Sequence, residues 1–450
     1  MPVAAIPKYL GQDFSSASPG LRFGMYLPIW TTRADQETEV HARAAKKSRE
    51  GLEVQALLQA RGMDATIADL CQRRSNPIPG IWDKNDFAAK HAWEKVVHLH
   101  GNDKKTMKAL ATRQAFAAGI CQNLLTLDAT ATAPLTTGLG NEHPLENGFA
   151  FLNPYGLPYL PGSGIKGVLR QAARELASGE WGDTHGWDRE TVHLLDKIEL
   201  STIDALFGRE TENGDSDHVR GALSFWDAIP QIPGDSLTVD IMTPHQSHYY
   251  QQKQDPKTGN STSPHDSGQP TPISFLTLPP GTRFTFHVQC DVPHLHRLAP
   301  DLAHNQRWQA LLTAAFEHAF EWLGFGAKTA VGYGAMQPDT AARQKREQAQ
   351  HAAAQAAHRA SLSPAQQCIE AFVVELRTKH EQFPSFKEGP NATFHNKARE
   401  LAKAAHEGAD WSPDEKRQAA EAIETWLPKL VRVDIKDERK KLKLGVLKGV

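Results

Sequence analysis

The sequence has few cysteines and no long apolar run. Its four cysteines show no C-x-x-C spacing, which argues against both a disulfide framework and a zinc knuckle; they are Cys71, Cys121, Cys290 and Cys368. No stretch of about 18 apolar residues occurs, and the amino terminus lacks the charged-then-apolar pattern of a signal peptide. We therefore expect a cytoplasmic protein with neither a membrane span nor an export signal.

An excess of positive charge is also missing. The 450 residues contain 50 Lys and Arg against 52 Asp and Glu, a formal net charge of −2. This balance excludes a globally basic nucleic-acid coat. The clearest local excess is the last segment, 429–450, which has eight Lys or Arg and three Asp or Glu.

The chain is long enough for two to three domains, and its composition changes twice. Residues 1–120 are predicted to form a loose arm and a helical region, with a strand-like stretch at 21–30 and helices at 35–61 and 87–118. Residues 121–338 are predicted to form a mixed α+β domain. Residues 339–450 are predicted to form a helical linker, a small helical appendix and a basic tail; the appendix helices are expected at 366–378, 393–406 and 413–426.

The mixed region begins with a half-buried strand. From Leu124, apolar residues alternate with Thr126, Asp128 and Thr130, which is the period of a strand. Further strands are expected at 222–228, 237–242, 273–278 and 283–288. The segment 244–272 is rich in Pro, Gly, Ser and His, so we expect it to form an exposed loop or a flexible hairpin.

A first glycine-rich segment covers residues 158–170, with the sequence PYLPGSGIKGVLR. Its apolar residues continue at helical spacing, so a helix is expected to begin just after the first glycines. The segment contains Gly162, Ser163, Gly164, Lys166, Gly167 and Arg170. A helix amino terminus flanked by glycines and two long cations suits a phosphate, although a capped helix with a solvated basic face fits the residues equally well. Neither a Walker A loop nor a G-x-G-x-x-G motif is present.

A second glycine-rich segment, 324–334, follows a long amphipathic helix and reads GFGAKTAVGYG. Gly324 fits a helix C-cap. The segment also supplies a cation, a hydroxyl and an aromatic ring at Lys328, Thr329 and Tyr333, among the further glycines Gly326, Gly332 and Gly334. A structural turn is the alternative interpretation. We expect the two segments to lie on one face and to form one groove.

These segments, together with several shorter motifs between them, resemble the RAMP proteins of type III CRISPR effector complexes, specifically the sixth-subunit type of the Cmr (type III-B) module. The shorter motifs occur in the family's order: TGLG at 137–140, ALFG at 205–208, GALSFWDA at 221–228 and VDIMTPH at 239–245. The resemblance spans about 124–336. One departure is Gly164, where many relatives carry a second serine.

The resemblance implies a ferredoxin-like, RRM-related domain with insertions. It also implies an RNA-binding subunit that contacts the CRISPR RNA (crRNA) backbone and caps the filament of backbone RAMP subunits near the 3′ end of the guide. Target RNA is then read by the guide duplex, with the small subunit among the other partners. The expected RNA contacts are Ser163, Lys166, Arg170, His245, Lys328, Thr329 and Tyr333, and no cofactor, metal ligand or membrane contact is expected.

Catalytic relatives of the superfamily use an aspartate in the loop after the first strand. Here the loop 133–140 reads APLTTGLG and contains no acid, so a non-catalytic role is expected. The alternative is a CRISPR-RNA-processing endoribonuclease with His245 as general base. His245 and His248 also have the spacing of half a metal site, but no further ligands occur at a recognised spacing.

Overall fold

The computed structural model describes residues 4–6, 8–11, 13–32, 82–84, 86–188, 191–195, 198–209, 218–243 and 272–449. The predicted helix at 35–61 and nearly all of the segment 244–272 lie outside the described residues. The chain divides into two compact units, Met1–Arg343 and Gln344–Val450. No described helix has both the length and the apolar character needed to cross a membrane.

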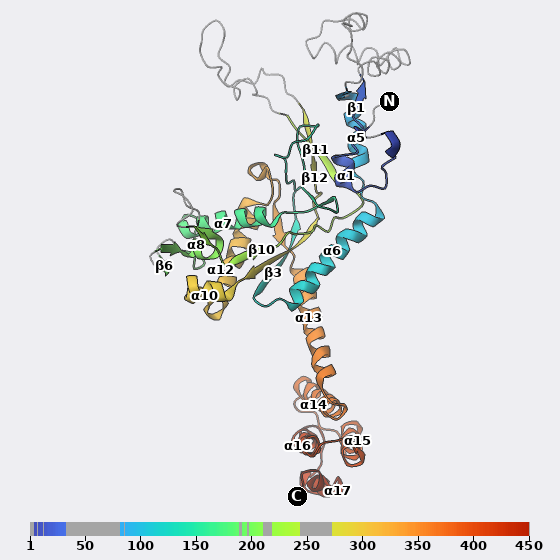
Figure 1. Ribbon diagram of the computed structural model, residues 1–450. Coiled ribbons are helices and arrows are strands. Elements are labelled where there is room, and N and C mark those ends of the chain that lie inside the picture. The colour runs from blue at the N-terminus through green and yellow to red at the C-terminus, as the bar shows by residue number, and fades with distance from the viewer. Residues whose placement is uncertain are drawn as a thin grey trace, which may run out of the picture. The chain divides into compact units, whose positions relative to one another are not determined.

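The first unit is built on a four-stranded antiparallel sheet (Figure 1). Its strands are β3 (Leu124–Ala131), β10 (Leu223–Phe225), β13 (Arg283–Cys290) and β14 (Met336–Pro338), in the order β10-β13-β3-β14. Helix α7 (Gly162–Ser178) follows β3, and α12 (Arg307–His318) follows β13. This βαββαβ chain order with that strand order is the ferredoxin-like arrangement, so the predicted α+β fold class is confirmed.

The core lies between the sheet and its two helices, which pack on each other. In the register of β3 and β13, Phe286 lies opposite Leu127 and Phe284 opposite Ala129, so the apolar residues of the predicted alternation share one face. Phe286 contacts Phe316 of α12 at a ring-centroid distance of 5.3 Å. The alternation in β3 therefore directs one face of the strand toward the helices.

Further short strands and helices are inserted between the elements of this core. They comprise β4 (Phe151–Leu152), β5 (Leu157–Pro158), β6 (Val192–Leu195), β7 (Ile198–Ser201), α8 (Thr202–Phe207), β8 (Gly208–Arg209), β9 (Val219–Arg220), β11 (Thr238–Met242), β12 (Ile273–Thr277), α10 (Val292–Leu298), α11 (Pro300–Ala303), η3 (His304–Gln306), η4 (Ala319–Leu323) and η5 (Thr329–Val331). The hairpin of β11 and β12 is inserted between β10 and β13. The four predicted strands between 222 and 288 correspond to β10, β11, β12 and β13.

The amino-terminal elements are η1 (Lys8–Leu10), α1 (Pro19–Phe23), β1 (Trp30–Thr32), β2 (Trp82–Lys84), α5 (Asp86–Val97) and α6 (Gly101–Ile120). The predicted strand at 21–30 is wrong, because Pro19 begins a short helix through Phe23 and only Trp30 is in a strand. The single helix predicted at 87–118 is two helices. His98 forms a β-bridge with Ser236, and the N–H of Leu99 donates to the carbonyl oxygen of Asp235 at 2.8 Å, so the helix is interrupted there.

The second unit is helical. Helix α13 (Thr340–Ser361) enters it and buries no side chain, and it is followed by α14 (Pro364–Gln382), α15 (Thr393–Glu407), α16 (Pro413–Leu430), α17 (Ile435–Lys441) and α18 (Leu444–Leu447). All three predicted appendix helices are present. The basic tail is folded, because Leu444 is fully buried and Arg439 and Lys448 both pair with Glu424 at 2.7 Å.

A buried hydrogen-bonded pair fixes α17 against α15. Oε2 of Glu438 lies 3.0 Å from Nε2 of His395, and both side chains are at most 2 % exposed. The N–H of Asn391 donates to Nδ1 of His395, so Nε2 is the donor to Glu438. Burial alone raises the pKa of the Glu438 carboxyl, but hydrogen bonds from Lys441 and His395 outweigh it and bring the pKa below its ordinary value of 4.5.

We expect Glu438→Ala to lower the free energy of unfolding of this unit by about 2–3 kcal/mol at pH 7, because a charged acceptor with two donors is lost. Since the folded-state pKa is depressed, the contribution is fully present above about pH 4.5 and is lost as the pH falls through the folded-state pKa. Denaturant unfolding at pH 7 and below pH 4 measures this difference. Glu407→Ala is the control, because Glu407 is an exposed partner of Lys403 and should change stability by less than about 0.5 kcal/mol; an equal loss in both variants would contradict the assignment.

Candidate nucleic-acid interface

Both glycine-rich segments lie at the same end of the sheet. Met336 of β14 pairs with Ala131, the last residue of β3, so the second segment reaches the sheet where β3 ends. The first segment reaches the end of β10, because Leu160 and Ala228 form a β-bridge just beyond that strand. β3 and β10 each pair antiparallel with β13, so they run in the same direction. Their carboxyl ends therefore lie at the same end of the sheet (Figure 1).

The first glycine of α7 is required by packing inside the chain. A Cβ atom at Gly162 would collide with the carbonyl oxygen of Phe225. The N–H of Gly162 donates to Oδ1 of Asp227 at 2.7 Å. The carboxylate of Asp227 therefore already accepts a hydrogen bond from the helix start at which the sequence predicts a phosphate. The motifs did not predict this carboxylate. Asp227 lies in the GALSFWDA motif, which is the feature of the sequence that points to this residue.

The other two glycines of α7 have no such requirement. Gly164 and Gly167 are exposed, and a Cβ atom at either position would have no heavy atom within 4 Å. Both lie inside the helix, where glycine is less favourable than alanine by roughly 1 kcal/mol. Ser163 is also exposed, and Lys166 is half-buried beside them. These four residues form an open surface on the first turns of α7 that a backbone can approach closely.

The structure places Arg170 differently from Lys166. Arg170 is 9 % exposed, and its Nη2 donates to the carbonyl oxygen of Gly208 at 3.0 Å and lies 3.8 Å from Oδ1 of Asp204. Helix α8 packs against α7 and brings these oxygens to the guanidinium group. We therefore assign Arg170 to the fold rather than to the surface that the sequence predicts.

The second segment is also fixed by packing. Phe325 is fully buried and its ring centroid lies 5.2 Å from that of Phe286. Gly326 and Gly334 have positive φ angles of 95° and 72°, and a Cβ atom would collide with the carbonyl oxygen of Thr136 or of Phe325, respectively. At Gly324, with φ 70°, a Cβ atom would lie 3.0 Å from the Tyr333 carbonyl oxygen. These three glycines are explained by a tight turn.

The polar side chains of the second segment contact the inserted hairpin. The Tyr333 hydroxyl donates to Oδ2 of Asp240 in β11, and the Nζ atom of Lys328 lies 5.5 Å from the ring centroid of Phe275 in β12. Burial, and then the hydrogen bond to Asp240, raise the pKa of Tyr333 to about 12, so the phenol remains protonated at neutral pH. Lys328, Tyr333 and Thr329, which begins η5, are all half-buried. The Tyr333 side chain therefore contacts the β11–β12 hairpin through its hydroxyl and its ring. Asp240 is a second carboxylate at the predicted site that the motifs did not predict.

The remaining predicted contact, His245, lies outside the described residues, as does His248. Within the described ranges, no group of three or more His, Cys, Asp or Glu side chains is arranged to hold a metal ion. The Cys290 thiol is buried, and this burial raises its pKa to about 12. Cys290 is therefore not activated as a nucleophile.

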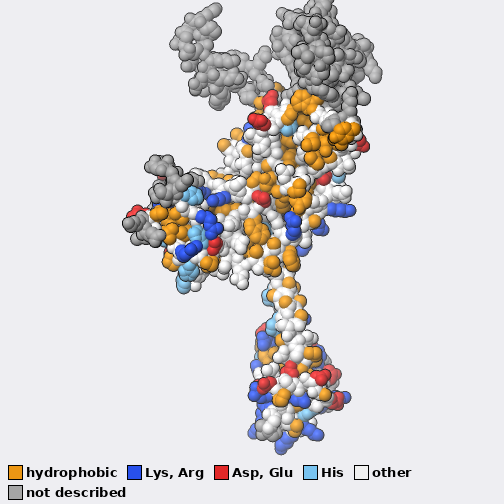
Figure 2. All heavy atoms as spheres, viewed as in Figure 1, with side chains coloured by type: hydrophobic (Ala, Val, Ile, Leu, Met, Phe, Trp, Pro, Cys, Tyr) orange, Lys and Arg blue, Asp and Glu red, His pale blue; other side chains and the backbone are white. Residues whose placement is uncertain are grey.

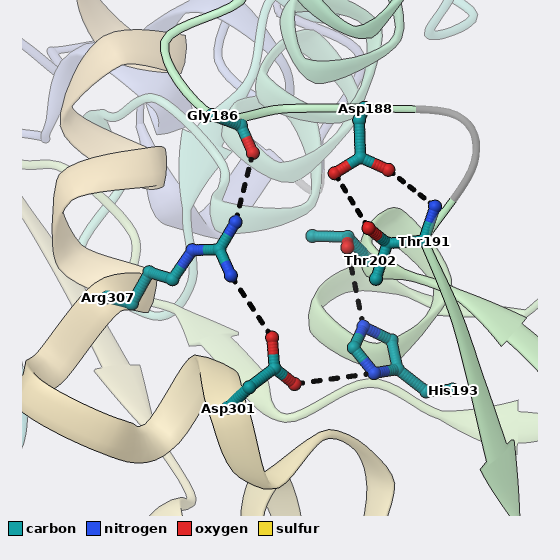
Figure 3. Close-up of polar contacts among 7 residues, drawn as sticks. All are labelled: Gly186, Asp188, Thr191, His193, Thr202, Asp301 and Arg307. Atoms are coloured by element: carbon teal, nitrogen blue, oxygen red, sulfur yellow. Dashed lines mark hydrogen bonds and ion pairs between the residues drawn. The ribbon is translucent and has the colours of Figure 1, made fainter.

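One polar cluster away from the glycine-rich segments has the outline of a catalytic triad (Figure 3). Nε2 of His193 lies 3.4 Å from the Thr202 hydroxyl, and Nδ1 lies 3.4 Å from Oδ1 of Asp301. Arg307 in turn contacts the second oxygen of Asp301 at 3.2 Å. Thr202 is only 2 % exposed, so its hydroxyl cannot reach a substrate. The cluster joins the β6–β7 hairpin to α11 and α12.

Comparison with known families gives a match over the same part of the chain. Residues 128–337 match the family model of the RAMP superfamily. This segment, slightly less than half of the chain, is similar to the RAMP superfamily. It contains the βαββαβ core except the first four residues of β3 and the last residue of β14, together with both glycine-rich segments. The resemblance to RAMP proteins stated from the motifs is therefore confirmed.

The proteins and structures that this chain is similar to include several named for Cmr. The chain is 30% identical over 236 residues to the CRISPR system Cmr subunit Cmr6 of Pyrococcus furiosus, covering 44% of this chain and 64% of that protein's length. Among solved structures, a cryo-EM structure of the type III-B Cmr-beta complex bound to cognate target RNA is similar at 17% identity, with a TM-score of 0.36 over 61% of this chain and 75% of the other. The crystal structure of Cmr6 from P. furiosus is similar at 25% identity, with a TM-score of 0.25 over 48% of this chain and 97% of the other.

Proposed function

We propose that this chain is a non-catalytic RNA-binding subunit of a Cmr-type CRISPR effector complex in the cytoplasm. It binds the crRNA backbone at the first turns of α7 and caps the filament of backbone RAMP subunits near the guide 3′ end. The RAMP domain and the relationship to a Cmr subunit support this role. The loop after β3, residues 132–140, contains no acid, which supports a role without cleavage.

The observation that carries the proposal is a glycine inside a helix, Gly167, that no contact within the described chain requires. Nothing in the described chain requires a glycine there, since the position is exposed, helical and free of neighbours within 4 Å. A glycine at this position costs helix stability, and this cost is explained if another molecule approaches the helix backbone closely. Lys166 beside it supplies a cation, and the helix amino terminus adds a positive dipole end. An RNA phosphate fits this surface.

We expect Gly167→Gln to weaken binding of single-stranded repeat RNA by at least about tenfold while stabilising the fold by roughly 0.5–1 kcal/mol. The side chain of glutamine blocks the close approach but favours the helix, so the two effects have opposite signs. Fluorescence anisotropy measures the binding, and thermal unfolding measures the stability. The bound RNA is expected to be recovered intact with and without divalent metal.

The matched control is Gly119→Gln, because Gly119 is likewise exposed, helical and without neighbours within 4 Å, but lies near the end of α6. It should give the same gain in stability with unchanged RNA binding. If Gly167→Gln binds RNA as the wild type does, the proposed contact surface is wrong. Cleavage of the RNA by the purified chain would instead support the processing endoribonuclease.

A further inference from the structure

A cavity of about 730 Å³ lies beside the first turns of α6, outside both glycine-rich segments. One wall carries Lys104, Lys105 and Lys108 of α6, and Arg283 at the start of β13 also lines it. The opposite wall is the loop 230–235. Cavities of about 300–1,000 Å³ are typical of sites for small organic ligands, so a nucleotide fits this volume.

The charge of the cavity is strongly one-sided. Its four Lys and Arg side chains face one carboxylate, Asp235, which pairs with Lys104. Lys105 and Lys108 are exposed. Lys108 lies three residues after Lys105 and four after Lys104, and like charges at these spacings are unfavourable for an isolated helix. Figure 2 shows Lys and Arg side chains on the surface over α6. A polyanion bound here would relieve this repulsion.

Two further features of the cavity favour an anion with hydrogen-bonding groups. Helix α6 is 20 residues long and its amino terminus opens at the cavity, since Gly101, its first residue, is in the lining. Nε2 of His100, which also lines the cavity, is buried and has no hydrogen-bond partner among the described residues. Buried polar atoms are normally satisfied, so this part of the chain retains an unused hydrogen-bonding atom.

The cavity lies at the same end of the sheet as the two glycine-rich segments. Arg283 pairs with Thr130 in the register of β13 and β3, and the N–H of Gly281 donates to the carbonyl oxygen of Ala131 at 2.7 Å. The start of α7 and the cavity at the start of α6 therefore both lie near this end of the sheet.

We propose that this cavity is a second RNA-binding site, in which Lys105, Lys108 and Arg283 hold the phosphates of a nucleotide from the strand bound at α7. The proposal rests on the proposed function and extends the RNA path to the amino-terminal helical region, outside the RAMP match. Lys104 remains paired with Asp235 and positions the loop 230–235.

The test is the triple variant Lys105→Gln, Lys108→Gln and Arg283→Gln in the full chain. Single-stranded binding depends on salt with a slope of about −0.7 per neutralised phosphate, so the loss of three contacts should reduce the slope by about 2. Between about 50 and 200 mM salt, the wild type should then lose about 20-fold more affinity than the variant. RNA carrying 4-thiouridine should crosslink to the peptide 98–108 in the wild type and not in the variant.

A matched control removes three exposed cations from the second unit, Arg399, Lys403 and Arg417, also by glutamine. It has the same change in net charge and should retain the wild-type salt slope. A wild-type slope in the cavity variant, with RNA binding still sensitive to Gly167→Gln, overturns this site and leaves the proposed function intact. An equal loss of slope in the control variant also overturns it, and a wild type that binds no RNA overturns both proposals.

Discussion

Replacing Gly334 by alanine is expected to lower the free energy of unfolding of the first unit by about 2–5 kcal/mol. The residue has a φ angle of 72°, which costs an L-residue about 1–2 kcal/mol. Its Cβ atom would also collide with the carbonyl oxygen of Phe325, and overpacking of this kind costs typically 1–3 kcal/mol. The collision cannot be relieved easily, because Phe325 is anchored in the core and the N–H of Gly334 donates to the carbonyl oxygen of Pro134 at 2.8 Å.

Gly332→Ala separates the two contributions. Gly332 also has a positive φ angle, 93°, but a Cβ atom there would have nothing within 4 Å. This variant should lose only the backbone part, about 1–2 kcal/mol. Denaturant unfolding of both variants measures the difference, and a loss at Gly334 no larger than at Gly332 would show that the turn is not constrained by Phe325.

The sequence predicts three of the four strands of the sheet, because their signals are local, whereas the three-residue strand β14 is not predicted. The alternation from Leu124 to Ala131 is visible in the sequence and covers the same residues as β3, in which the apolar Ala129 and Ala131 are buried and Thr130 between them is half-buried. The break between α5 and α6 was missed, since it depends on a β-bridge between His98 and Ser236, 138 residues apart. Helix periodicity continues across the break and gives no sign of that long-range pairing.

The site residues stay a prediction, but the structure shows which of the glycines the fold itself requires. A glycine can be required by a positive φ angle, by tight packing inside the chain or by the close approach of another molecule, and the sequence alone does not distinguish these causes. The structure assigns Gly162, Gly326 and Gly334 to collisions with carbonyl oxygens of distant segments and leaves Gly164 and Gly167 without an internal reason. The cavity at α6 was missed because its cations come from two segments, α6 and β13, that only the fold brings together.

Arg170 and Lys166 provide the sharpest contrast between fold and function, since they lie one helical turn apart on α7. Arg170→Met is expected to destabilise the first unit by about 2–3 kcal/mol, because the buried carbonyl oxygen of Gly208 loses a charged donor. Methionine preserves the length and the apolar part of the side chain, so the loss is mainly that of the hydrogen bond. RNA binding by the folded protein should be unchanged, with the same salt slope.

Lys166→Met should give the reverse result. Lys166 is half-buried beside the exposed Gly167, and removing its charge should leave stability within about 0.5 kcal/mol and reduce the salt slope of RNA binding by about 0.7, the value for one phosphate on a single strand. Unfolding curves and salt titrations of both variants test the contrast. A lowered salt slope in Arg170→Met at full stability would show that Arg170 contacts RNA. A guanidinium group that bonds only within the fold does not change the number of neutralised phosphates.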